Sequence, residues 1–219
     1  MLIHPWDVGS EEEWRAFLAA QTVGTLIVPT DDLPVVTPTH YVWDGTHVVL
    51  HLARPNPALA AVRERVVFSV HGDWAYVPSA WKAVGDEDPT LGIPTSYYAA
   101  VTLTCTVEVL QGEELLDVLR LQLKHFEPGS TVADPAVHAR QLPGIRGLRL
   151  TPTDVQAKFK YGGNVDDAHR AAVVDRLPEG ARRQLLRRTP VSRTSGMRAR
   201  AASPGRSCSS GNPGDHRNP

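Results

Sequence analysis

The chain has 219 residues, 42% of them hydrophobic, and a formal net charge of −1. This composition supports a packed core and excludes a chain that is disordered throughout. No apolar run approaches the roughly 18–20 residues needed to cross a bilayer. The N-terminus also lacks a basic region followed by an apolar stretch. We therefore expect neither a membrane span nor a signal peptide.

The distribution of charge and the two cysteines argue against direct DNA binding and against a disulfide. From Ala181 onward the chain carries nine arginines and one acid, whereas the preceding body carries 14 basic and 23 acidic residues. An acidic body is a poor match to the phosphate backbone of DNA, which argues against direct DNA binding by the folded part. Cys105 lies in a predicted strand and Cys208 in the tail, so we expect no disulfide and a cytoplasmic location.

The first 64 residues predict a helix, a strand hairpin and a short helix. Ser10 and Glu13 form a capping box ahead of apolar residues at helical spacing, which predicts an amphipathic helix. Asp44-Gly45 is a two-residue hairpin signal. Pro57 suits the first turn of a helix. The expected elements are strands at 22–28, 35–43 and 46–52 and a helix at 57–64.

The remainder of the body also predicts more strand than helix. Strands are expected at 66–71, 74–77, 97–110, 145–151 and 155–160, with polar loops at 82–93 and 127–143. Helices are expected at 113–126 and at 164–177, the second capped by Asn164 or Asp166. Many short antiparallel strands with few helices are typical of a barrel, so the fold class is mainly β with flanking helices.

The C-terminal segment has a different composition. Residues 192–219 contain no Ile, Leu, Val, Phe, Tyr or Trp. Such a segment cannot bury enough apolar surface to offset its ordering entropy. We therefore divide the chain into a domain at 1–177 and a basic tail at 178–219 that is expected to be disordered.

Arg54 and Asn56 lie between a predicted strand end and a predicted helix start, flanked by two prolines. A guanidinium beside backbone amides at a helix N-terminus is suited to receive a phosphate. The alternative is a loop arginine that pairs with a carboxylate. Nucleotide-binding glycine patterns such as GxGxxG and the P-loop are absent, which disfavours Rossmann and P-loop folds.

Two histidines, His40 and His51, lie on strands that the hairpin brings together, so they could reach one ligand. No third ligand follows at a usual spacing and HExxH is absent, so we predict no metal site. The alternative is a pair of polar residues on a half-buried sheet. No residue pattern identifies a catalytic group.

Aromatic and basic side chains cluster near the 82–93 loop and at the end of the last strand. Trp81, Tyr97 and Tyr98 could wall a planar ring, although core packing is the usual role of such residues. Lys158 and Lys160 could meet an anion from a partner subunit, or they could belong to a solvated strand.

An ordered series of segments resembles a known family. The segments are TPTHYVW at 37–43, HLARPNP at 51–57, GDWAYVPSAW at 72–81, IPTSYYAAV at 93–101 and AKFKYGGN at 157–164. Over residues 1–177 the chain resembles the PaiB-type FMN-binding split-barrel proteins, often named FMN-binding negative transcriptional regulators. It departs from the family motifs at Ser96-Tyr97, where Trp-Asn is common, and at Thr102 and Cys105, where His and Gly are usual.

The resemblance implies a six-stranded FMN-binding split β-barrel, a homodimer and an FMN molecule near the subunit interface. It places Arg54 and Asn56 at the phosphate, with His40 and His51 on adjacent strands near the cofactor. It also implies that Trp81, Tyr97 and Tyr98 line the pocket and that Lys158 and Lys160 belong to the site. The expected function is a flavin-binding transcriptional regulator that acts directly or indirectly. The alternatives are a flavin-dependent oxidoreductase and a haem-handling split barrel with His51 as iron ligand.

Overall fold

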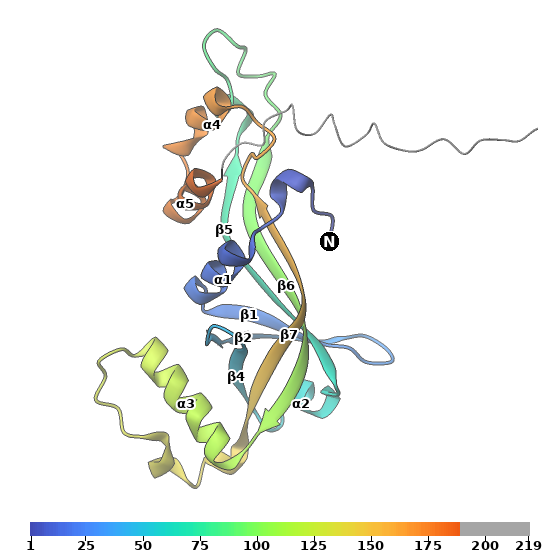
Figure 1. Cartoon of the computed structure of the whole chain (residues 1–219), viewed down its shortest axis with the longest axis vertical. Helices are drawn as coiled ribbons and strands as arrows, with labels where there is room; N and C mark the ends of the chain where they lie inside the picture. The colour runs from blue at the N-terminus through green and yellow to red at the C-terminus, as the bar shows by residue number, and fades with distance from the viewer. Residues whose placement is uncertain (189–219) are drawn as a thin grey trace, which may run out of the picture.

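The computed structural model describes residues 1–188, which form a seven-stranded antiparallel sheet with flanking helices (Figure 1). The strands are β1 (Val23–Val28), β2 (Val35–His40), β3 (Val42–Trp43), β4 (Val48–Ala53), β5 (Arg65–Val77), β6 (Thr95–Leu110) and β7 (Ile145–Lys160). The helices are α1 (Glu11–Ala20), α2 (Pro57–Ala61), α3 (Gly112–Phe126), α4 (Asp167–Val174) and α5 (Glu179–Arg187). Short 3₁₀ turns lie at Pro5–Asp7, Ser79–Trp81, Pro135–His138 and Leu142–Gly144.

The sheet curls until its two edge strands meet. Its order is β2-β1-β5-β6-β7-β4-β3, and the chain passes from one edge strand to the other through the single residue Tyr41. The Tyr41 side chain is fully buried and its hydroxyl donates to the Leu18 carbonyl at 2.8 Å. This arrangement confirms the predicted mainly β barrel. It has seven strands rather than six, because Tyr41 separates the short β3 from the strand expected at 35–43.

The long strands β6 and β7 form an antiparallel pair that runs the length of the molecule (Figure 1). Its register runs from Tyr98 opposite Lys160 to Leu110 opposite Gly147. We had expected two strands in place of β7 and two in place of β5, but both are continuous. At Gly72-Asp73, where the sequence predicted a break, β5 continues through a β-bulge, and Asp73 has a φ of 50°. The register of β6 and β7 shifts between Thr104 and Cys105.

The N-terminal helix α1 begins at the predicted capping box. The Ser10 side chain accepts from the Glu13 amide, and the Glu13 side chain accepts from the Ser10 amide at 2.8 Å. α1 buries Trp14, Phe17 and Leu18 against the barrel core. Helix α3 matches its prediction closely, α2 is shorter than predicted, and α4 begins at its predicted cap Asp166. No helix in residues 1–188 is long and apolar enough to cross a membrane.

Helix α5 corrects the predicted boundary of the C-terminal tail. It lies inside the segment 178–219 that we expected to be disordered, yet it buries Ala181, Gln184 and Leu185. Figure 1 shows it beside α4 and β5. The expectation was wrong for residues 179–187, and residues 189–219 lie outside the described part of the chain.

We expect a chain that ends at Arg188 to fold, dimerise and bind flavin like the full chain. Removal of 189–219 keeps every contact that α5 makes with residues 1–188, and it deletes a segment without Phe, Tyr or Trp whose only large apolar side chains are Val191 and Met197. Thermal melting and FMN titration of the two chains test this. A melting temperature lower by several degrees, or lost flavin, would show that the tail packs on the barrel.

Candidate functional site

The two predicted histidines meet on the outside of the barrel. His40 ends β2 and His51 lies in β4, and their ring centroids are 5.1 Å apart with planes at 72°. Phe126, the last residue of α3, packs edge-on against His40 at 5.4 Å. The register of the β3–β4 hairpin, Val42 opposite Val49, places His40 near His51, and α3 covers both.

Gln122 of α3 sets the state of His51. Its Oε1 lies 2.6 Å from His51 Nδ1. Because Oε1 can only accept, His51 Nδ1 is the donor in this hydrogen bond. Gln122 is only 4% exposed, and its Nε2 has no hydrogen-bond partner within the described residues. A buried donor without a partner costs about 1–3 kcal/mol.

These side chains line one pocket of about 470 Å³, here called the histidine pocket. Its polar lining includes His40, His51 and Gln122, and its apolar walls come from α3 and from residues 132–135. Burial lowers the pKa of His40, and the neighbouring His51 lowers it further. His40 is therefore neutral at pH 7.

Sequence reasoning missed Gln122, although a signal was present. The helix predicted at 113–126 has its apolar residues at helical spacing, and Gln122 falls on the same face as the buried Leu115 and Val118. A polar residue at a buried helical position needs a partner inside the protein. That requirement singles out Gln122 as a residue with a specific role.

The segment 54–57, here called the Arg54 turn, leaves β4 and enters α2. Arg54 is exposed, and its backbone amide donates to the Gly144 carbonyl at 2.7 Å. Asn56 is the N-cap of α2, since its Oδ1 accepts from the Ala58 amide at 2.9 Å. The Arg54 guanidinium therefore faces solvent, whereas Asn56 Oδ1 is engaged in the capping hydrogen bond of α2.

Four other predicted residues, together with Lys82, lie at the far end of the β6–β7 pair, here called the lysine end: Trp81, Tyr98, Lys158 and Lys160. Lys158 lies 5.6 Å from the centre of the Tyr98 ring and donates to the Leu2 carbonyl at 3.0 Å. Lys160 donates to Thr95 Oγ1 at 2.9 Å. Burial and the nearby Lys160 lower the pKa of Lys82, a residue that sequence reasoning did not select.

Tyr97 does not belong to this surface. Its side chain is 2% exposed and packs against Tyr161, with ring centroids 5.8 Å apart. Neighbouring residues of a strand point to opposite faces, so Tyr97 enters the core while Tyr98 turns outward. The expectation that Tyr97 lines a cofactor pocket is corrected.

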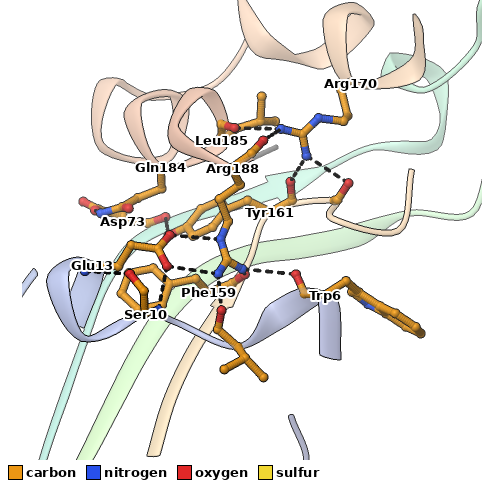
Figure 2. A network of polar contacts seen from close by, with 12 residues as sticks. Trp6, Ser10, Glu13, Asp73, Phe159, Tyr161, Arg170, Gln184, Leu185 and Arg188 are labelled. Atoms are coloured by element: carbon orange, nitrogen blue, oxygen red, sulfur yellow. Dashed lines mark hydrogen bonds and ion pairs between the residues drawn. The ribbon is translucent and has the colours of Figure 1, made fainter. Parts of the chain in front are cut away.

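A network of polar contacts joins the N-terminal segment, the end of β7 and helices α4 and α5 (Figure 2). Arg188, which follows α5, donates to the carbonyls of Trp6, Val8 and Phe159 and pairs with the Glu13 carboxylate. Arg170 of α4 donates to the carbonyls of Tyr161, Gly162, Leu185 and Arg188. The N-terminal segment, the end of β7 and α5 are thereby held as one unit.

The Arg54 turn and the lysine end lie far apart in one chain. His51 pairs with Gly147 near the start of β7, and Lys158 lies eleven residues further along the same strand. At about 3.3 Å per residue this is up to roughly 36 Å, more than the length of an FMN molecule. Within residues 1–188 no group of three or more His, Cys, Asp or Glu side chains is placed to hold a metal ion.

Solved structures with a similar fold handle flavins. A FAD- and haem-binding protein from Mycobacterium smegmatis is 20% identical, with 75% of this chain and 78% of that chain covered at a TM-score of 0.56. A flavocytochrome from Azotobacter vinelandii is 18% identical, with 74% and 73% covered at a TM-score of 0.55. At these identities the likeness shows the fold alone, which is the flavin-binding split barrel.

Comparison of the sequence with known proteins identifies the family of the chain. The chain is 24% identical over 180 residues to the "Protease synthase and sporulation protein PAI 2" of Bacillus subtilis (strain 168), covering 77% of this chain and 84% of the relative. Residues 2–154 match the family model described as "Putative FMN-binding domain". This match spans most of the folded part, so the chain belongs to the FMN-binding domain family.

Proposed function

We propose that two copies of the protein hold FMN between them, with the Arg54 turn of one copy and the lysine end of the other at each site. The observation that carries this proposal is the separation of the two groups along β7. Within residues 1–188 neither the exposed Arg54 nor the part-buried Lys160 forms an ion pair, so both are suited to an anion, and we infer that one chain cannot bring both to the same FMN. A two-fold axis brings opposite ends of two identical strands together.

A second feature supports the homodimer. Trp74 and Tyr76 of β5 are 64% and 52% exposed, at the same end of the sheet as the half-buried Tyr98. Exposed aromatic side chains on a sheet face favour burial against a partner. We expect light scattering at micromolar concentration with FMN present to give twice the mass of the chain. A monomer under these conditions would contradict the shared site.

Mixed dimers test the shared site directly. Arg54→Ala and Lys158→Ala damage different halves of each site, so either variant alone is expected to bind FMN weakly. When the two variants are mixed and exchange subunits, about a quarter of all sites become intact, because each mixed dimer has one undamaged pair. FMN fluorescence quenching measures this recovery. No recovery after exchange would place both residues in a site within one chain, or outside the site.

For the biological role we propose a flavin-responsive regulator that acts indirectly. The name of the Bacillus subtilis relative supports a role in controlling protease production and sporulation for that protein. Residues 1–188 of this chain carry 18 basic and 23 acidic residues, a net charge of −5 that disfavours a DNA-binding face. The visible spectrum of the purified protein is the first test: two broad bands indicate flavin, and a sharp Soret band would favour the haem alternative instead.

A further inference from the structure

Only one of the two polar atoms of the Gln122 side chain has a hydrogen-bond partner within the described residues. Its carbonyl oxygen is taken by His51 Nδ1 at 2.6 Å, while its amide nitrogen is buried without a partner in the described chain. Buried polar groups in folded proteins nearly always find a partner, and each exception calls for an explanation, of which a missing bound molecule is one. Because Gln122 lines the histidine pocket, a molecule bound there can supply the missing acceptor.

The remaining walls restrict the charge and polarity of such a molecule. Among the described residues that line the histidine pocket, none is Lys or Arg, and Glu127 contributes a carboxylate. An anion would find no permanently charged cation there and would be repelled by Glu127. Leu119, Leu123 and Phe126 supply apolar surface, and His40 adds an aromatic ring. These walls fit an uncharged, largely apolar ring.

We propose that the histidine pocket binds an uncharged aromatic molecule whose carbonyl oxygen accepts a hydrogen bond from Gln122 Nε2. The site is separate from the Arg54 turn, which does not line the pocket, and the proposal does not rest on FMN binding. The amide nitrogen is closed to water. Ligand entry therefore requires an apolar wall to move, and Phe126 is placed to do so because it is 39% exposed in the last turn of α3.

Two ligands that differ at one position test the hydrogen bond. 1-Tetralone and tetralin have the same bicyclic frame, but the first has a carbonyl where the second has a methylene group. We expect 1-tetralone to bind at least about fivefold more tightly, since the carbonyl satisfies a buried donor. In ¹⁵N-edited NMR of the full chain, the Gln122 side-chain amide signal should shift with 1-tetralone and much less with tetralin.

Two matched variants test whether Gln122 causes the preference for 1-tetralone over tetralin. In Gln122→Met, which keeps the length of the side chain and removes the amide, the two ligands should bind equally. Gln111→Met is the control, because Gln111 is exposed just before the same helix and makes no side-chain cap. It should keep the full preference. 1-Naphthoate, a ring of similar size with a negative charge, should bind more weakly than 1-tetralone.

Three results would overturn the proposal. They are equal affinity of the full chain for the two ligands, a preference that survives in Gln122→Met, and no binding of 1-tetralone at millimolar concentration. If Gln122→Met does not fold, the side-chain amide signal of the unmodified protein still decides. Loss of FMN binding in a separate titration would refute the proposed function without changing any of these outcomes.

Discussion

Replacement of Arg54 by alanine is expected to weaken FMN binding at least about tenfold, because a charge-assisted hydrogen bond to phosphate contributes roughly 1.5–3 kcal/mol. Riboflavin, which has no phosphate, should bind the variant and the unmodified protein almost equally. The Arg54 guanidinium is exposed at the start of a turn whose backbone is fixed by the bond from its amide to Gly144. The substitution therefore removes a charge from the surface without disturbing the fold.

Titration of both flavins by fluorescence quenching measures this difference. Arg140→Ala provides a control that removes an exposed arginine from another loop. It should leave both affinities unchanged. If Arg54→Ala binds FMN as tightly as the unmodified protein, Arg54 has no part in the phosphate site.

Replacement of Arg170 by methionine is expected to produce the largest loss of stability among single substitutions in the C-terminal part. Arg170 is 6% exposed, and its guanidinium donates to the Leu185 carbonyl at 2.8 Å and to the Gly162 carbonyl at 3.0 Å, among others. Methionine fills much of the volume but leaves these buried acceptors without donors. We expect a loss on the order of 3 kcal/mol or more.

For a domain of this size such a loss lowers the melting temperature by roughly 6–12 °C. Calorimetry of Arg170→Met and of Arg182→Met distinguishes the loss of buried hydrogen bonds from the loss of a positive charge. Arg182 is an exposed arginine of α5 that pairs with Asp175 at 3.2 Å. The second variant should melt within about 2 °C of the unmodified protein. Equal melting of all three proteins would show that the network in Figure 2 contributes little to stability.

The sequence predicted those elements whose signals are local. The capping box at Ser10 and the hairpin near Asp44-Gly45 each depend on side-chain or turn chemistry within a few residues. The capping box is present as predicted. The hairpin is present too, but Trp43 pairs with Val48 and the Asp44 amide donates to the His47 carbonyl, so the turn is centred one residue later and β4 starts at Val48 rather than at residue 46. Helix α3 was predicted because its apolar spacing is regular over four turns. The meeting of His40 and His51 followed from the same hairpin, with no knowledge of the barrel.

The errors arise where distant contacts override local signals. A glycine and an aspartate at 72–73 are typical of a turn, but pairing with β6 on one side carries β5 through them as a bulge. Helix α5 is short and polar on average, with three arginines in nine residues, so its composition alone does not predict a buried helix. It is held by Arg170 and by the bond from Gln184 to Asp73 at 2.7 Å, which join residues far apart in the chain.

The site was predicted in part for a similar reason. Tyr97 and Tyr98 were assigned the same role, although strand alternation alone separates them into core and surface. Gln122 and Lys82 were missed because each gains its meaning from a neighbour on another element, His51 in one case and Lys160 in the other. The Oδ1 of Asn56 caps α2, a role that the sequence reasoning did not assign to it.

The contacts of Arg188 also bear on the order of events during synthesis. Its guanidinium reaches the carbonyls of Trp6 and Val8, residues that leave the ribosome at the very beginning of translation. The N-terminal segment can pair with β7 only after residue 158 has been made, and it gains its arginine donor only after residue 188. The same holds for the core, which includes Ala181 and Leu185 of α5. The attachment of the first nine residues and the completion of the core therefore both wait for the C-terminal helix to be made.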